Sequence, residues 1–143
     1  MIEEQNKLIS HSPEETLAFG RKIARNFKSG DVVCLYGDLG AGKTHLVKGI
    51  ASSFGLDENE VQSPTFTIIN EYRAITPVYH FDFYRINSFK EALEIGVEEY
   101  FYGDGICLIE WPEKIAEIIP EQAIHIYLKH QSGNDREIFV TIG

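Results

Sequence analysis

The stretch that most constrains this chain runs from residue 37 to residue 44 and reads Gly-Asp-Leu-Gly-Ala-Gly-Lys-Thr. It matches the pattern G-x-x-x-x-G-K-[ST], in which backbone N–H groups wrap around a phosphate chain. Its glycines have no Cβ to block that approach or to forbid a positive φ. In such a loop Lys43 reaches the β- and γ-phosphates, and the Thr44 hydroxyl is placed to bind Mg²⁺. The pattern predicts a phosphate-binding loop.

The segments on either side of this loop fit the same prediction. An apolar run, Val32–Tyr36, comes directly before the loop and is typical of a buried strand. Residues 45 to 54 follow it, with Leu46, Val47 and Ile50 at helical spacing, and end at Gly55. A helix that starts at the loop directs its N-terminal dipole and unpaired N–H groups at an anion. Strand, loop and helix together indicate a nucleotide-binding protein.

Composition limits the architecture and the kind of partner. The chain has 143 residues, 43% of them hydrophobic, which predicts one folded domain spanning residues 1–143. It has no apolar run of membrane-spanning length and no basic-then-apolar leader, so we expect a soluble, cytoplasmic protein without membrane contact. Acidic residues outnumber Lys and Arg by 22 to 13, which favours a basic protein partner over bare nucleic acid. Cys34 and Cys107 lack C-x-x-C spacing and are expected to be buried thiols.

Capping boxes at Ser12 and Ser88 predict the starts of two helices, the first of which we expect to end at Gly30. Residues 2–10 are a weak candidate for an edge strand. Two antiparallel hairpins are predicted from pairs of strand-like segments: residues 66–72 with 77–84, and residues 123–129 with 136–142. The expected fold is α/β and P-loop NTPase-like, with a mostly parallel central sheet flanked by helices and extended by these antiparallel hairpins.

The first hairpin carries a candidate site residue. Alternation with a period of two puts Asp82 on the same face as His80 and Tyr84, opposite two phenylalanines. That face is either solvated or directs the Asp82 carboxylate at the nucleotide site. Thr65 follows Pro64 and either begins an ordinary strand after a rigid turn or lies on a switch loop that senses the γ-phosphate and Mg²⁺.

A second carboxylate follows an apolar run. Residues 106 to 111 read Ile-Cys-Leu-Ile-Glu-Trp, and an apolar strand that ends in an acid next to a phosphate-binding loop is the Walker B pattern. Glu110 there would hold Mg²⁺ directly or through water, or orient the attacking water. From the residues alone, Trp111 is interpreted as a packed aromatic at a strand end and Arg136 as a solvated hairpin arginine.

Four motifs occur in a fixed order, and together they resemble the TsaE (YjeE) family of small bacterial ATPases over nearly the whole chain. The motifs are the loop at residues 37–44, Ser63-Pro64-Thr65-Phe66, His80-x-Asp82-x-Tyr84-Arg85, and Ile109-Glu110-Trp111-x-Glu113. The resemblance implies a Mg²⁺-dependent ATPase. It would act with TsaD and TsaB to form threonylcarbamoyladenosine in tRNAs that read codons beginning with adenine. TsaD would do the transfer chemistry, and the ATPase would meet tRNA only through the complex, in an indirect or regulatory role.

The resemblance also implies residue roles. Lys43, Asp82 and Glu110 would be catalytic, with either Asp82 or Glu110 positioning the water, and Thr44 and Glu110 would serve Mg²⁺. Thr65 resembles a switch residue, and Trp111 a residue important for activity beside the metal carboxylate. The residues implied to contact ATP are Ser12, Gly37, Asp38, Leu39, Gly40, Ala41, Gly42, Lys43, Thr44, Thr65, Trp111 and Arg136.

Two other functions fit a phosphate-binding loop. A small-molecule kinase closes an arginine-bearing lid over the transferred group, whereas this chain has five arginines, none clustered. A nucleotide-gated binding module would use ATP to control docking and hydrolysis only to reset it. We expect slow turnover until partners complete the site, since the sequence offers no obvious arginine finger other than Arg85.

Overall fold

The computed structural model describes residues 7–38, 42–62, 64 and 68–142. Their strands form one seven-stranded sheet in the order β1-β7-β6-β2-β5-β4-β3. The elements in chain order are β1 (Lys7–Ser10), α1 (Pro13–Ala24), β2 (Val32–Tyr36), α2 (Lys43–Ser53), β3 (Ile69–Tyr72), β4 (Val78–Asp82), α3 (Phe89–Glu94), α4 (Val97–Phe101), β5 (Ile106–Glu110), the 3₁₀ helix η1 (Pro112–Ile118), β6 (Ile124–His130) and β7 (Arg136–Ile142).

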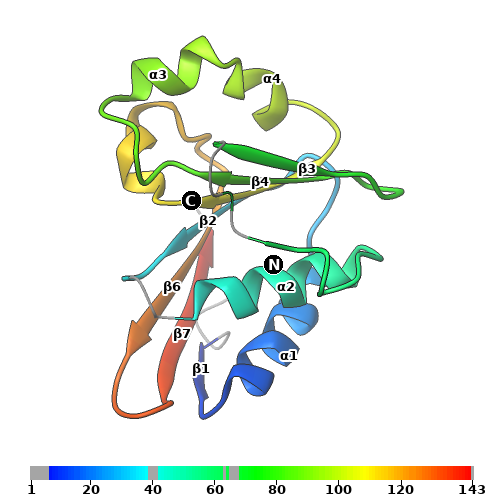
Figure 1. Ribbon diagram of the computed structural model, residues 1–143, viewed down its shortest axis with the longest axis vertical. Helices are drawn as coiled ribbons and strands as arrows, with labels where there is room; N and C mark the ends of the chain where they lie inside the picture. Colours follow the sequence, from blue (N-terminus) through cyan, green and yellow to red (C-terminus); the bar gives the residue numbers. More distant parts are fainter. Residues whose placement is uncertain (1–6, 39–41, 63, 65–67, 143) are drawn as a thin grey trace.

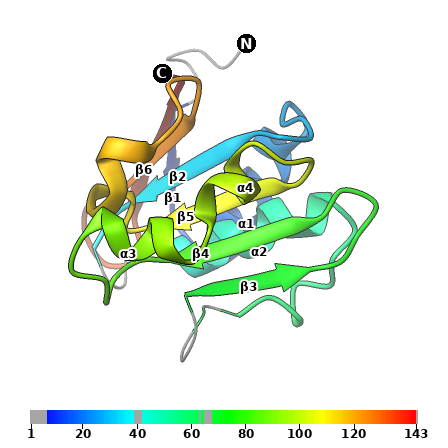
Figure 2. The ribbon, with the colours of Figure 1, turned by 90° about the horizontal axis from the view of Figure 1, so that it is seen from above.

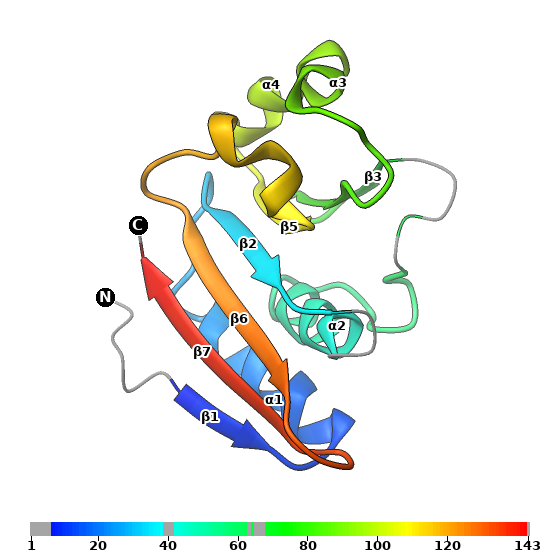
Figure 3. The same ribbon diagram turned by 90° about the vertical axis from the view of Figure 1, so that its left-hand side faces the viewer.

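The centre of the sheet is parallel and its edges are antiparallel. Strands β6, β2, β5 and β4 are neighbours that run the same way. The two predicted hairpins, β3–β4 and β6–β7, add antiparallel pairs on either side, and β1 pairs with β7 at the edge. Figure 3 shows β2 and β6 running in one direction and β7 returning between β6 and β1. The predicted fold class is confirmed.

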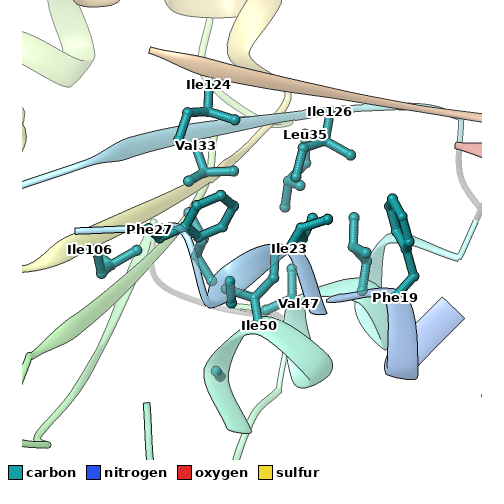
Figure 4. Close-up of a cluster of buried hydrophobic side chains, with 14 of the residues drawn as sticks. Phe19, Ile23, Phe27, Val33, Leu35, Val47, Ile50, Ile106, Ile124 and Ile126 are labelled. Carbon is teal, nitrogen blue, oxygen red and sulfur yellow. The ribbon is translucent and has the colours of Figure 1, made fainter. Parts of the chain in front are cut away.

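Helices cover both faces of the centre of the sheet (Figure 1), and β2 and β5 are apolar at nearly every position on both faces. In β2, Val33 and Leu35 pack with α1 and α2, while Val32 and Cys34 pack with the other cluster, which includes residues of α3, α4 and η1. Figure 4 shows the first cluster, and Figure 2 shows α3 and α4 lying across β4 and β5. Two hydrophobic cores therefore hold the sheet from opposite sides.

The first helix starts where the sequence predicts and ends earlier. The Glu15 N–H donates to the Ser12 hydroxyl, so Ser12 is the N-cap of α1. The helix ends at Ala24 instead of Gly30, because the chain continues in tight turns with i→i−3 hydrogen bonds up to Phe27. Those turns keep Phe27 in the core.

Both cysteines are buried and unpaired, as predicted. Burial raises the pKa of each thiol to about 12, so both stay protonated and act as small apolar side chains. None of the helices in the described ranges combines the length and apolarity needed to cross a bilayer.

Candidate active site

The carboxyl ends of three parallel strands, β2, β5 and β4, meet at one edge of the sheet, which is where open α/β sheets bind ligands. Asp82 ends β4, Glu110 ends β5, and the two are direct partners in the strand register. Alternation with a period of two puts both on the face that packs against α1 and α2, because Ile106 and Leu108 of the same strand lie in that core. The predicted pair of carboxylates lies near Lys43, which ends the predicted phosphate-binding loop with Thr44.

Lys43 begins α2 and is only 5% exposed. Its ammonium nitrogen Nζ is buried and has no hydrogen-bond partner among the described residues. A buried ammonium without a hydrogen-bond partner is costly, so this group is set up to meet an anion. Gly42 precedes it with φ 97°, a left-handed conformation that glycine adopts without strain, and turns the chain into the helix. The N-terminal end of the helix dipole adds a partial positive charge at the same point.

Trp111 covers the lysine. The Lys43 Nζ lies 4.3 Å from the centroid of the Trp111 ring, a cation–π contact, and the Tyr84 ring packs 4.9 Å from the same indole. Trp111 has φ 58° and ψ 49°. No other non-glycine residue in the described part of the chain has a positive φ. This conformation costs about 1–2 kcal/mol, and such strain is found mostly at functional sites. The tight turn from Glu110 into η1 thus holds the ring over Lys43.

Electrostatic interactions link these groups into one cluster. Burial raises the pKa of the Asp82 carboxyl above its usual value, and the nearby Glu110 carboxylate raises it further. A hydrogen bond from the Tyr84 N–H to Asp82 Oδ1 (2.9 Å) lowers this pKa, as do His80 and Lys43. Two carboxylates close together repel each other, and a cation between them and a phosphate would relieve that repulsion.

His80 is a site residue to which the sequence pattern assigned no role. It is 1% exposed, and its Nε2 lies 2.6 Å from Glu110 Oε2. Sequence alternation grouped His80 with Asp82, yet its partner is Glu110 on the adjacent strand. That pairing depends on β4 lying beside β5, which the sequence pattern did not specify. Tyr84 was also missed as a packing partner of Trp111.

The remaining predicted residues lie around this cluster or outside the described ranges. Gly37 and the exposed Asp38 follow β2, and the exposed Thr44 is the second residue of α2. A Cβ built on Gly42 would lie 4.0 Å from the Thr16 methyl group, so the loop ends near the first turn of α1. Leu39, Gly40, Ala41 and Thr65 lie outside the described residues, and their roles stay predictions.

Ser12 and Arg136 have local partners. The Ser12 hydroxyl caps α1, and the Arg136 Nη1 donates to the carbonyls of Gly133 (3.1 Å) and Asp135 (3.0 Å) in the β6–β7 turn. Their proposed contacts with nucleotide also stay predictions. Within the described residues, no group of three or more His, Cys, Asp or Glu side chains forms a metal-binding cluster. A Mg²⁺ ion bound with a nucleotide needs only one or two carboxylates besides phosphate oxygens and water.

A sheet with a parallel centre, whose strand ends present two carboxylates beside a lysine at the start of a helix, defines a P-loop-like α/β protein. A family model described as threonylcarbamoyl adenosine biosynthesis protein TsaE matches residues 10–138. The chain belongs to the TsaE family, as the sequence motifs indicated.

Relatives from distant bacteria agree with this assignment. The Bacillus subtilis tRNA threonylcarbamoyladenosine biosynthesis protein TsaE is 45% identical over 134 residues, covering 92% of this chain and 83% of that protein. The Treponema pallidum protein of the same name is 40% identical over 134 residues, covering 94% of this chain and 98% of that protein. A crystal structure of Bacillus subtilis YdiB matches all of this chain and 88% of that one, with a TM-score of 0.80 and 39% identity.

Proposed function

We propose that this chain is a Mg²⁺-dependent P-loop ATPase of the bacterial cytoplasm that acts in threonylcarbamoyladenosine modification of tRNA. The observation that carries the ATPase proposal is the buried Lys43 Nζ, which has no hydrogen-bond partner among the described residues and lies in the same site as Asp82 and Glu110. The tRNA role rests on family membership and on the names of the relatives. The residues fit ATP and Mg²⁺, since a lysine ammonium without a hydrogen-bond partner among the described residues lies near a pair of carboxylates.

Each residue then has a distinct task. Lys43 and the N–H groups at the start of α2 hold phosphate oxygens and stabilise the charge that develops on them. Thr44 and Glu110 are proposed to hold Mg²⁺, which when bound neutralises phosphate charge. Asp82, with its raised pKa, is suited to accept a hydrogen bond from the attacking water and to position it.

TsaB and TsaD are the proposed partners. The chain carries a formal charge of −9, so direct contact with tRNA phosphates is unfavourable, and tRNA would be met only through the complex. The transfer step belongs to TsaD in this proposal, and ATP hydrolysis resets or regulates the assembly.

The test is phosphate release from Mg-ATP by the purified protein, alone and with TsaB and TsaD. We expect slow release alone and a clear rise with the pair, abolished by Lys43→Ala. The matched control is Lys48→Ala, on α2 but outside the site. ATP consumption that ignores the pair, but rises with a small acceptor that becomes phosphorylated in place of phosphate release, would contradict the proposal and favour a kinase.

A further inference from the structure

The His80–Glu110 contact joins two buried polar side chains at the carboxyl ends of parallel strands. His80 is paired with Leu108 in the strand register, so its ring reaches along the sheet to the carboxylate two residues further on. The Nε2–Oε2 distance is 2.6 Å, and the side chains of His80 and Glu110 are 1% and 7% exposed. Because an ionised carboxylate only accepts hydrogen bonds, Nε2 carries the hydrogen and donates it.

Stability alone does not explain this pair. Replacing a buried charged pair by apolar side chains of similar volume is often neutral or stabilising, so such a pair is weak evidence for a stabilising role. The strand neighbours, Leu108 and Ile109, are fully buried and apolar, so apolar side chains would fit this region. The other ring nitrogen of His80, Nδ1, is buried without a hydrogen-bond partner in the described ranges. Within the described ranges, Glu110 is therefore the hydrogen-bond partner of the His80 ring.

The contact has a geometric consequence for Glu110. A free glutamate side chain samples several rotamers, whereas a short hydrogen bond to a buried ring fixes one of them. The contact engages Oε2, and a carboxylate has a second oxygen, Oε1, that can accept from other groups. One oxygen is held and the other remains for a ligand at the edge of the sheet.

We propose that His80 is a positioning residue, which holds the Glu110 carboxylate in one orientation and leaves its second oxygen for the metal ion or water of the reaction. This inference rests on the proposed ATPase function. It parallels the way in which buried partners orient metal-binding side chains, where loss of the partner costs about 10- to 100-fold in metal affinity or activity.

Two polar variants separate the role of the Nε2 donor from simple filling of the space. In His80→Gln the amide nitrogen takes nearly the position of Nε2, so it can still donate to Glu110. In His80→Asn the amide reaches only the position of Nδ1, so the donor is lost while a polar side chain remains. His125→Gln is the control, because His125 lies on β6, outside this contact. Its Nδ1 forms a hydrogen bond with the Tyr36 hydroxyl (2.8 Å).

Three measurements are made on each variant of the full chain: kcat and KM for Mg-ATP, ATP affinity without metal, and Mn²⁺ affinity by electron paramagnetic resonance with a non-hydrolysable ATP analogue. We expect His80→Asn to lower kcat or Mn²⁺ affinity about 10- to 100-fold with metal-free ATP affinity unchanged. His80→Gln and His125→Gln should stay close to wild type.

If His80→Asn and His80→Gln have equal kcat and equal Mn²⁺ affinity, whether both match wild type or both are reduced, the proposal is overturned. If His80→Asn does not fold, His80→Gln alone decides, because a large loss in that variant shows that the donor is not what matters. If the wild-type protein releases no phosphate even with TsaB and TsaD, the proposed function fails. Mn²⁺ affinity still tests His80 in that case, so the two failures are distinguishable.

Discussion

Lys43 and Trp111 form the most informative single contact in the molecule. A cation–π contact is worth about 0.5–2 kcal/mol, whereas hydrogen bonds that involve charged groups contribute about 1.5–3 kcal/mol each. Nζ can form several such bonds with phosphate oxygens, so ATP should draw the ammonium away from the indole, whose centroid is 4.3 Å from it. Trp111 is therefore placed to report on the occupancy of the site.

This exchange predicts a fluorescence signal. Trp111 is the only tryptophan in the chain, so its emission is that of the site alone. We expect titration with ATP to change the emission saturably, and Lys43→Met to remove the change because the phosphates lose their main cation. Lys48→Met serves as the control and should titrate like wild type. An unchanged spectrum at saturating ATP, with binding verified by calorimetry, would contradict the exchange.

Asp82 should cost stability at neutral pH. Its folded-state pKa is raised, mainly by burial and also by Glu110, so the folded state binds the proton more tightly than the unfolded state. Stability is then lost as pH rises from the unfolded pKa through the folded one. We expect Asp82→Asn to be more stable than wild type at neutral pH by about 1 kcal/mol at most, since water screens a half-buried charge.

The pH dependence distinguishes this explanation from a general effect of mutation. The Asp82→Asn side chain keeps an oxygen that can accept from the Tyr84 N–H, so the local backbone geometry is retained. The gain over wild type in urea unfolding should therefore shrink in acid, where Asp82 is protonated. Glu117→Gln, at an exposed position in η1, should show no such trend. A gain that is constant with pH would rule the charge out as its cause.

At the scale of elements, the sequence predicted those parts that depend on local pattern. The apolar runs of β2 and β5 identify central parallel strands, because strands buried on both faces are apolar at nearly every position. Ser12 identified the start of α1 through its capping chemistry. Which strand lies beside which depends on tertiary packing, so the neighbouring positions of β4 and β5, and with them the His80–Glu110 contact, could not be predicted.

The two helices on one face approach so closely that glycine is required at their contact. A Cβ on Gly20 of α1 would lie 2.7 Å from the Leu46 carbonyl oxygen, and one on Gly49 of α2 would overlap the Leu17 carbonyl oxygen. Alanine in a helix normally gains about 1 kcal/mol over glycine, whereas overpacking a core costs about 1–3 kcal/mol or more. The overlap is with backbone, which cannot rotate away, so the steric cost should exceed the gain.

We therefore expect Gly49→Ala to lower the free energy of unfolding by about 1–3 kcal/mol, measured by urea denaturation. It should also weaken ATP binding, because separating α1 from α2 shifts the start of α2 that carries Lys43. Ser53→Ala, at an exposed position of the same helix, is the control and should change neither quantity. A more stable Gly49→Ala variant would mean that α1 and α2 can separate without cost.

At the scale of the whole molecule, a rigid scaffold surrounds a strained and charged site. Two apolar cores fix the strands from both faces, and the energetically costly features gather at one edge of the sheet. Those features are the buried Lys43 ammonium, the left-handed Trp111 and the Asp82–Glu110 pair. Such strain persists only where the surrounding packing holds it in place, which is what the two cores provide.

The net charge of the molecule predicts how it would meet the proposed partners. With a formal charge of −9, this chain should be attracted over long range to a basic surface and repelled by tRNA phosphates. Added salt screens charges beyond about 8 Å at physiological ionic strength, so association with TsaB and TsaD, followed by stopped-flow fluorescence, should slow as salt is raised. Bare tRNA should show no binding to the isolated chain in filter assays at any of these salt concentrations. Association that speeds up with salt, or tight binding of tRNA to the chain alone, would show that a local basic patch outweighs the net charge in choosing the partner.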